Sequence, residues 1–418
     1  MQTNQLLAMF SGVLLLLGLI AFFLGRAKAA RVRATGTAMY AQPDQYAWFA
    51  VLATAGPAIT VGAVGAFLLL LLGADIPTFY LLAASLVIAA LGLVVGMSLV
   101  KPDFHARQAI ERAIRWVLVA AALISIFTTF GILFSIVFEA LRFFQLHSFW
   151  DFITGTVWNP GASFLAAAGR GDEGGSAAQF GSVPLFAGTF MITAIAMLVA
   201  IPVGLLSAIY MAEFAPRRVR TLAKPTLEVL AGIPTVVYGF FAAITVAPII
   251  VDVAGFFGLD ASFNNAVAPG LVMGIMIIPF ISSLSDDVIN SVPDSMRQGS
   301  LALGMTKGET IRDVVIPAAL PGIISASLLA VSRALGETMI VVMAAGMRPN
   351  LTANPLEDMT TVTVRIVAAL TGDLEFESAE TLSAFALGLV LFAVTLSLNL
   401  VSVLLIRRFR EKYRVNNL

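Results

Sequence analysis

Two ionisable residues, Arg333 and Glu337, lie within one long apolar stretch of the chain. The stretch, PGIISASLLAVSRALGETMIVVMAAG, runs from Pro321 to Gly346 and is long enough to cross a bilayer. A charge at the centre of a membrane helix costs about 2.5–3.5 kcal/mol on insertion scales, so charged residues at that depth are candidates for function. Because the two residues are four positions apart, we predict that they lie on one face of a helix, about one turn apart.

The chemistry that suits Arg333 is the binding of an oxyanion. Arg333 follows Pro321 by twelve residues, or about 18 Å of helix, which is close to the midplane of a membrane. A guanidinium stays charged there and offers a planar fork of donors to a tetrahedral anion such as phosphate. Glu337 would hold the arginine when no anion is bound, and Ser332 and Thr338 would add hydroxyl donors. An ion pair that locks two helices together is an equally good interpretation of the charges, and small polar residues in membrane helices are more often packing contacts.

Motifs for catalysis and for metal binding are missing from the sequence. The segment MTKGET around Lys307 lacks the glycine-lysine pair of a nucleotide-binding phosphate loop, and neither HExxH nor GxSxG occurs. With no cysteine and only two histidines, the chain offers no thiolate or histidine-rich metal site. We therefore expect no catalytic residue, no metal and no cofactor, and we do not expect this chain to hydrolyse nucleotide itself.

The composition predicts an all-α, polytopic membrane protein. Of the 418 residues, 59% are hydrophobic and only 12% are charged, whereas soluble proteins have about a quarter charged residues. The first apolar run reads as a retained anchor, because its basic residues follow it. Nine runs are long enough to span the lipid bilayer: 6–24, 47–72, 78–100, 116–138, 184–210, 227–251, 268–285, 321–346 and 382–405.

The distribution of lysine and arginine predicts the orientation of these spans. With the N-terminus outside, twenty of the basic residues fall in inner segments and four in outer segments, in agreement with the positive-inside rule. The C-terminus is then cytoplasmic. The segment Asp103–Trp116 alternates apolar and basic residues, which favours a helix on the inner membrane surface over a solvated basic loop.

Two outer loops and one apolar segment have an unusual composition. The outer loop 141–183 is aromatic at first and then rich in glycine, so we expect its second part to be mobile. The outer loop 347–382 is acidic and is either solvated surface or a docking face for an external partner. The segment GIPTVVYGFF, with Gly232, Pro234 and Gly239, is either a packing kink or a helix break that lines a pathway.

The inner loop before the eighth run carries the most specific signal. Permeases of ABC importers have a cytoplasmic motif that begins EAA, continues with a glycine after three residues and ends in Ile-x-Leu-Pro after nine more. Gln298, Gly299 and Ser300 occupy the EAA positions, Gly304 is the glycine, and Val314, Val315, Ile316 and Pro317 fill the end. The loop is therefore EAA-like in its spacing and position but lacks the acidic residue.

The chain resembles the membrane-spanning subunits of type I ABC importers, and among them the PstC-type subunit of phosphate importers. The resemblance rests on five segments. They are the EAA-like loop ALGMTKGETIRDVVIPAALPGI, the segment RALGETMIVVMAAG from Arg333, the segment LEVLAGIPTVVYGFF from Leu227, the long apolar run from Phe180 and the outer segment FWDFITGTVWNP. It covers roughly Phe180 to Arg408 and says little about residues 1–100.

The resemblance implies an organisation and a set of partners. It implies a six-helix permease core in residues 184–409 with a coupling loop at 286–317, a first core span and outer loop in 101–183, and three accessory spans in 1–100. It also implies a PstA-type permease partner, a dimer of ATPase subunits that grips Gln298 to Pro317, and an external protein that delivers inorganic phosphate. Arg333 and Glu337 would serve translocation, in the inner membrane of a bacterial cell, with no nucleic acid involved.

Two other functions fit the same sequence. One is a permease for a different oxyanion, such as phosphonate or molybdate. The other is a sensory or scaffold protein of the same fold that no longer transports. Competition between phosphate and those anions for uptake distinguishes a phosphate permease from a permease for another oxyanion. If phosphate uptake persists after the chain is removed, the chain is a sensory or scaffold protein.

Overall fold

The computed structural model describes residues 3–73, 77–160, 179–372 and 378–414, which are helical almost throughout. Nine helices within these residues are long and apolar enough to cross a membrane, which confirms the predicted number of spans. The glycine-rich segment 161–178 and the acidic residues Asp373, Glu375 and Glu377 lie outside the described residues. By its internal contacts the chain divides into two compact units, Met1–Gly131 and Ile132–Leu418.

The first unit is a bundle whose helices are held together by small residues and a few long-range hydrogen bonds. Its helices are α1 (Thr3–Ala34), α2 (Pro43–Leu72), α3 (Thr78–Ser98) and the first part of α4 (Ala106–Leu146). Lys28 Nζ donates to the carbonyl of Met97 at 2.6 Å, and the buried Tyr46 hydroxyl donates to the carbonyl of Phe104 at 2.7 Å. These bonds tie α1 to the end of α3, and α2 to the segment that leads into α4.

Helix α4 corrects the prediction of a separate surface helix at 103–116. The described helix is continuous from Ala106 to Leu146, so these residues form the first turns of the same helix that contains the fourth span. The physical reason is the absence of proline and glycine between Ala106 and Trp116, which leaves nothing to end the helix there. Arg107 and Glu111 support these turns with an exposed ion pair at 2.7 Å.

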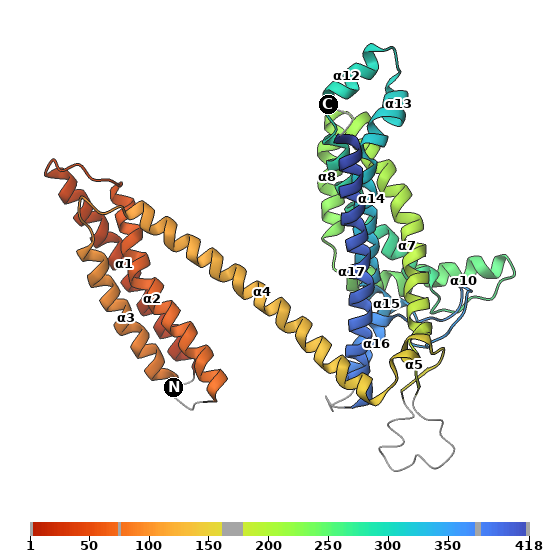
Figure 1. Cartoon of the computed structure of the whole chain (residues 1–418), viewed down its shortest axis with the longest axis horizontal. Helices are drawn as coiled ribbons and strands as arrows, with labels where there is room; N and C mark the ends of the chain where they lie inside the picture. The colour runs from red at the N-terminus through yellow and green to blue at the C-terminus, as the bar shows by residue number, and fades with distance from the viewer. Residues whose placement is uncertain (1–2, 74–76, 161–178, 373–377, 415–418) are drawn as a thin grey trace, which may run out of the picture. The chain divides into compact units, whose positions relative to one another are not determined.

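The second unit holds the remaining elements (Figure 1). In chain order they are α5 (Phe149–Thr154), β1 (Trp158–Asn159), β2 (Gln179–Phe180), α7 (Val183–Ile209), η1 (Tyr210–Phe214), α8 (Arg217–Ala231), α9 (Thr235–Phe241), η2 (Ala242–Val246), α10 (Ala247–Phe256), α11 (Val267–Asn290), α12 (Asp294–Ala302), α13 (Lys307–Thr310), η3 (Ile311–Val315), α14 (Ile316–Leu335), α15 (Met339–Ala344), α16 (Val362–Gly372) and α17 (Ala379–Arg414). Helices α12 and α13 project beyond the bundle at the end where α17 terminates, and α5 lies at the opposite end.

Helices α7 and α11 form the core of this unit. Glycines let the two backbones approach closely: a Cβ on Gly270 would lie 2.8 Å from the Cβ of Ile195, and one on Gly274 would lie 2.9 Å from the carbonyl oxygen of Ala196. Small residues at such contacts are the usual means of packing membrane helices. Ile277 and Ile281 of α11 are fully buried in the surrounding apolar cluster, so α7 and α11 form one tightly packed pair.

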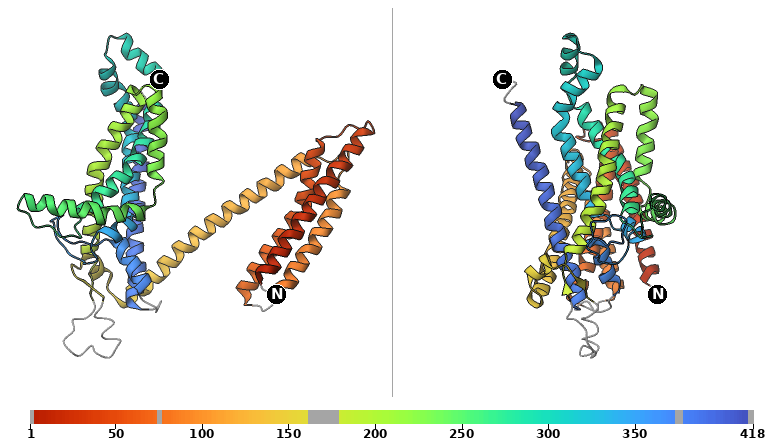
Figure 2. Two further views of the ribbon diagram at one scale, coloured as in Figure 1. Left: turned by 180° about the vertical axis from the view of Figure 1, so that it is seen from behind. Right: turned by 90° about the vertical axis from the view of Figure 1, so that its right-hand side faces the viewer.

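Two of the predicted spans are broken helices. The sixth span was predicted at 227–251, but α8 ends at Ala231 and a new helix begins at Thr235, after Gly232 and Pro234. Its continuation, α10, extends sideways from the bundle (Figures 1 and 2). The eighth span was predicted at 321–346, but α14 ends at Leu335 and α15 begins at Met339.

The two breaks lie next to each other because α9 packs against α15. A Cβ on Gly239 would lie 2.9 Å from the Cβ of Met343 and 3.0 Å from the carbonyl oxygen of Met339. The segment from Gly232 to Pro234 thus interrupts the helix completely and does not merely kink it. Backbone groups freed at such a break need partners, and the Tyr238 hydroxyl supplies one by donating to the carbonyl of Leu230 at 3.0 Å.

Replacement of Gly274 by valine tests the α7–α11 contact. The added side chain would meet the Ala196 carbonyl and the Val199 side chain, at 2.9 and 3.2 Å from its Cβ. Overpacking of this kind costs about 1–3 kcal/mol, so we expect a lower midpoint of thermal unfolding for the purified protein in detergent. Gly255→Val is the matched control, because no atom lies within 4 Å of its Cβ position. Equal midpoints for the two variants would contradict the close packing.

Candidate functional site

A cavity of about 180 Å³ lies between α8, α11 and the end of α14. Most of its wall is apolar, but four charged side chains reach it, two basic and two acidic. The lining residues are Met211, Lys224, Leu227, Glu228, Ala231, Met276, Pro279, Phe280, Ser283, Asp286 and Arg333. A largely apolar cavity with a few convergent polar groups is the usual form of a small-ligand site.

Arg333 lies in the last turn of α14, where it lines the cavity. Its guanidinium carbon lies 5.4 Å from the centre of the Phe280 ring, in a cation–π contact. Among the residues that the structure describes, no acidic side chain lies within ion-pair distance of it. Its donors are therefore free to bind an anion.

The predicted one-turn relation between Arg333 and Glu337 is wrong, because α14 ends at Leu335 before it reaches Glu337. Glu337 lies in the break between α14 and α15, where its Oε1 accepts from the backbone N–H of Met339 at 3.2 Å. Its own carbonyl accepts from the Thr363 hydroxyl at 2.9 Å, which ties the break to α16. Glu337 thus stabilises the bend of the chain, and no ion pair joins it to Arg333 in the described structure.

The other two candidates for translocation lie beside the break and do not line the cavity. Ser332 precedes Arg333 on α14 and is partly exposed. Thr338 directly precedes α15, and its hydroxyl donates to the carbonyl of Gly336 at 3.3 Å. Of the four predicted residues, the structure brings only Arg333 to the cavity wall.

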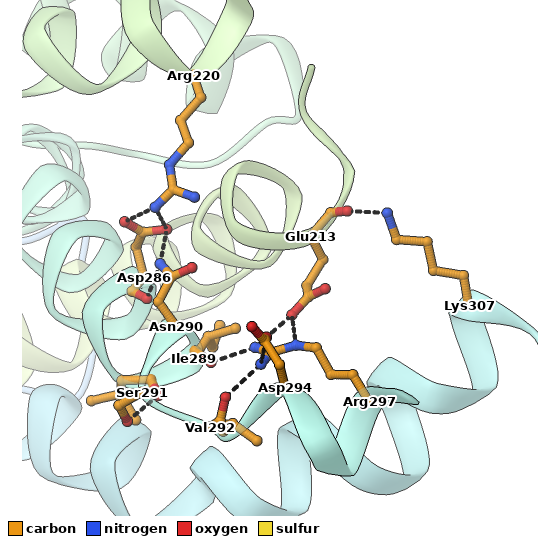
Figure 3. A network of polar contacts seen from close by, with 11 residues as sticks. Glu213, Arg220, Asp286, Ile289, Asn290, Ser291, Val292, Asp294, Arg297 and Lys307 are labelled. Atoms are coloured by element: carbon orange, nitrogen blue, oxygen red, sulfur yellow. Dashed lines mark hydrogen bonds and ion pairs between the residues drawn. The ribbon is translucent and has the colours of Figure 1, made fainter. Parts of the chain in front are cut away.

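A buried ion cluster at Asp286 is a feature that the sequence did not reveal (Figure 3). Asp286, on α11, is 1% exposed and is paired with Arg220 at 3.1 Å and Lys224 at 3.3 Å, both from α8. Asn290 donates to the same carboxylate at 2.9 Å. The only signal in the sequence was the pair Asp286–Asp287 at the inner end of an apolar run, opposite the basic segment 217–224.

The cluster links α8 to α11 at one side of the cavity. The hydrogen bond with Asp286 raises the pKa of Lys224 above its ordinary value of 10.5. Because the folded-state pKa is the higher one, the stability that this charge contributes is present below pH 10.5 and is lost only as the pH rises through the folded-state pKa. At physiological pH Lys224 is therefore charged.

The EAA-like loop forms the projecting pair α12 and α13. Gln298 and Gly299 are exposed on α12, whereas the Ser300 hydroxyl is buried and bonds the Thr310 hydroxyl at 2.8 Å. Gly304 has a φ of +86°, a backbone conformation that favours glycine. Val314 falls in η3, and Ile316 and Pro317 form the first turn of α14, so the loop leads directly into the helix that bears Arg333.

Of the outer acidic loop, the structure describes Glu357, Asp358 and Glu380. Glu357 accepts hydrogen bonds from the side chains of Asn350 and Asn354, both at 3.2 Å. Burial raises the pKa of Asp358, although Arg348 acts in the opposite direction. These contacts order part of the loop, and its two interpretations, solvated surface and docking face, both stay predictions.

Comparison with known proteins places the second unit among transport permeases. Residues 200–411 match the family described as binding-protein-dependent transport system inner membrane component. Residues 12–72, in the first unit, match a second family, described as phosphate ATP-binding cassette transporter.

Individual relatives extend over most of the chain. The probable ABC transporter permease protein YqgH of Bacillus subtilis is 33% identical over 311 residues, which are 74% of this chain and 94% of the relative. The phosphate transport system permease protein PstC 1 of Mycobacterium tuberculosis is 33% identical over 316 residues, 71% of this chain and 93% of the relative. PstC of Mesorhizobium japonicum is 33% identical over 59% of this chain and 74% of the relative.

Replacement of Asp286 by asparagine tests the buried cluster. The variant takes the buried counter-charge away from Arg220 and Lys224, so we expect a loss of about 1.5–3 kcal/mol, the range for hydrogen bonds to charged groups. The result would be a lower unfolding midpoint and faster proteolysis of α8 in the purified protein. Asp287→Asn is the control, because this neighbour is 67% exposed, lies 3.5 Å from Lys224 and forms a surface pair of small energy. Equal behaviour of the two variants would argue against the cluster as the link between α8 and α11.

Proposed function

This chain belongs to the family of binding-protein-dependent ABC transport permeases of the inner membrane, and on that premise we propose that it imports inorganic phosphate. It is the permease subunit of an ATP-driven phosphate importer and forms half of the translocation pathway. As an ABC permease it works with ATPase subunits and with a substrate-binding protein. The relatives named PstC support phosphate over other oxyanions.

The observation that carries the proposal is that the guanidinium of Arg333, at the wall of the cavity, has no carboxylate partner among the residues that the structure describes. Arg333 is exposed in the described structure and keeps its charge, so its donors are accessible to an anion. A tetrahedral oxyanion would supply that counter-charge and would accept two parallel hydrogen bonds from the planar fork. The contact with Phe280 holds the guanidinium in place before the anion arrives.

The loop α12–α13 is the site at which we propose the ATPase dimer binds. Its exposed surface includes Gln298, Gly299 and the large apolar side chains Leu301 and Leu303, of which Leu303 is 87% exposed. Without the acidic residue of the EAA motif, the loop docks through shape and apolar contact. Ser300 acts inside the loop, since its hydroxyl holds α12 against Thr310. Motion of the loop reaches Arg333 through Pro317 and α14.

The remaining partners and the orientation follow from the same assignment. A PstA-type permease forms the other half of the pathway, and an external phosphate-binding protein delivers the anion to the outer loops. The loop α12–α13 and the end of α17 lie at one end of the second unit, in agreement with a cytoplasmic location for both (Figure 1). The N-terminus is then outside, as the distribution of basic residues predicts.

Substitution of Arg333 tests the anion contact. Arg333→Ala removes two charge-assisted hydrogen bonds, each worth about 1.5–3 kcal/mol, so we expect at least a 100-fold loss of phosphate uptake by the complete transporter in proteoliposomes. Arg333→Lys keeps the charge but loses the fork, and we expect it to restore only part of the rate. Arg107→Ala, which removes an exposed arginine on α4, is the control. Undiminished uptake by an assembled Arg333→Ala complex would refute the role of Arg333 in binding the anion. If phosphonate or molybdate competes more strongly than unlabelled phosphate, phosphate is not the preferred substrate.

Substitution of Gly304 tests the coupling loop. Valine strains the left-handed backbone at this position by about 1–2 kcal/mol, whereas asparagine adopts that conformation more readily. We therefore expect Gly304→Val to prevent ATPase docking or to separate ATP hydrolysis from transport, and Gly304→Asn to keep most of the coupling. Co-purification of the ATPase and the ratio of phosphate imported to ATP hydrolysed measure the two effects. An unaffected Gly304→Val complex would count against the assignment of the loop.

A further inference from the structure

We propose that Glu213, in the π-helical turn η1 that continues α7, is a positioning residue that makes the coupling loop move together with the α7–α11 pair. The inference rests on the proposed docking of an ATPase at α12, but not on the identity of the transported anion. It adds a second route for motion to the one through Pro317 and α14.

The first link is a nearly buried ion pair between Glu213 and Arg297 (Figure 3). The side chain of Glu213 is 11% exposed and that of Arg297 is 17% exposed. Arg297 projects from α12, and its Nη2 and Nε lie 2.9 and 3.0 Å from Glu213 Oε1. A pair this well shielded from water is screened little by salt, so it holds α12 against the end of α7.

Arg297 also fixes α12 to the end of α11. Its Nη2 donates to the carbonyl of Ile289 at 2.7 Å, and its Nη1 donates to the carbonyl of Val292. The carbonyl of Ile289 belongs to the last turn of α11 and also accepts from the backbone N–H of Val292 at 3.3 Å. One guanidinium therefore joins three segments: α12, the end of α11 and the end of α7.

A second link leaves the other side of the loop and reaches the same place. Lys307, at the start of α13, donates to the backbone carbonyl of Glu213. Its ammonium also lies 5.2 Å from the centre of the Phe214 ring. The segments before and after Gly304 are thus both anchored at residues 213–214, and the loop is clamped to α7 from two sides.

The anchored segment passes its motion to the cavity. Glu213 and Phe214 close the π-helical turn η1, which continues α7 without a break. Helix α7 is packed tightly against α11 through Gly270 and Gly274. Helix α11 in turn carries Phe280, under the guanidinium of Arg333, and Asp286, which holds α8. A displacement of α12 would therefore move one wall of the cavity relative to α14.

The test uses the complete transporter in proteoliposomes and measures both anion import and ATP hydrolysis. Glu213→Gln removes the charge at constant size, and Glu213→Ala removes the side chain. We expect the ratio of anion imported to ATP hydrolysed to fall about 3-fold in Glu213→Gln and at least about 10-fold in Glu213→Ala. The rate of ATP hydrolysis should change less than about twofold in both variants. Glu111→Gln, in the exposed Arg107–Glu111 pair on α4, is the matched control and should leave the ratio unchanged.

A covalent replacement of the link separates positioning from simple stabilisation. The chain has no cysteine, so Glu213→Cys with Arg297→Cys creates a unique pair. We expect the double variant to lose coupling and a short bismaleimide cross-link between the two thiols to recover at least half of it. If Glu213 only stabilises the fold, import and ATP hydrolysis should fall together with the amount of assembled complex. An unchanged ratio of anion imported to ATP hydrolysed in Glu213→Ala would therefore overturn the proposal, and so would a loss of import on cross-linking. If the wild-type chain imports an anion other than phosphate, the ratio is measured with that anion and the test stands. If it shows no ATP-coupled import at all, both proposals fail.

Discussion

A guanidinium stays charged at any depth in a membrane protein, and this constraint governs the region around Arg333. The described structure places the guanidinium at the end of α14, over the ring of Phe280 and at the wall of a cavity, without a carboxylate beside it. The acidic residue nearest in sequence, Glu337, is occupied at the helix break. In the proposed function, the transported anion is the negative partner of Arg333.

The helix breaks explain why the arginine is available. An uninterrupted helix through Gly336 would have brought Glu337 back to the side of Arg333 one turn later. Because α14 ends at Leu335, Glu337 instead supports the bend toward α15. Helix α15 packs against α9, which follows the break after α8. The cavity wall on the other side is α11, which is packed against α7 and held to α8 by Asp286. Arg333 thus lies between a tightly packed helix pair and a broken helix.

Apolar runs were sufficient to predict the number of spans, because this feature depends on hydrophobicity and length. The spans at 227–251 and 321–346 were misplaced, since a single proline or glycine in an apolar run can either kink a helix or end it, and tertiary packing decides which. The same limit led to the wrong relation between Arg333 and Glu337. Asp286, Glu213 and Arg297 were not found, because each is paired with a residue more than sixty positions away and nothing in the local sequence marks such pairs.

The central claim is that Arg333 binds the transported anion, and a structure of the assembled transporter with a bound anion tests it most directly. We would trap the complex with a non-hydrolysable ATP analogue in the presence of arsenate, a tetrahedral analogue of phosphate with a strong scattering signal, and determine its structure. The account predicts a tetrahedral density within hydrogen-bond distance of both terminal nitrogens of Arg333, next to Phe280. A guanidinium paired instead with a carboxylate of the partner permease, with the anion bound elsewhere, would contradict it.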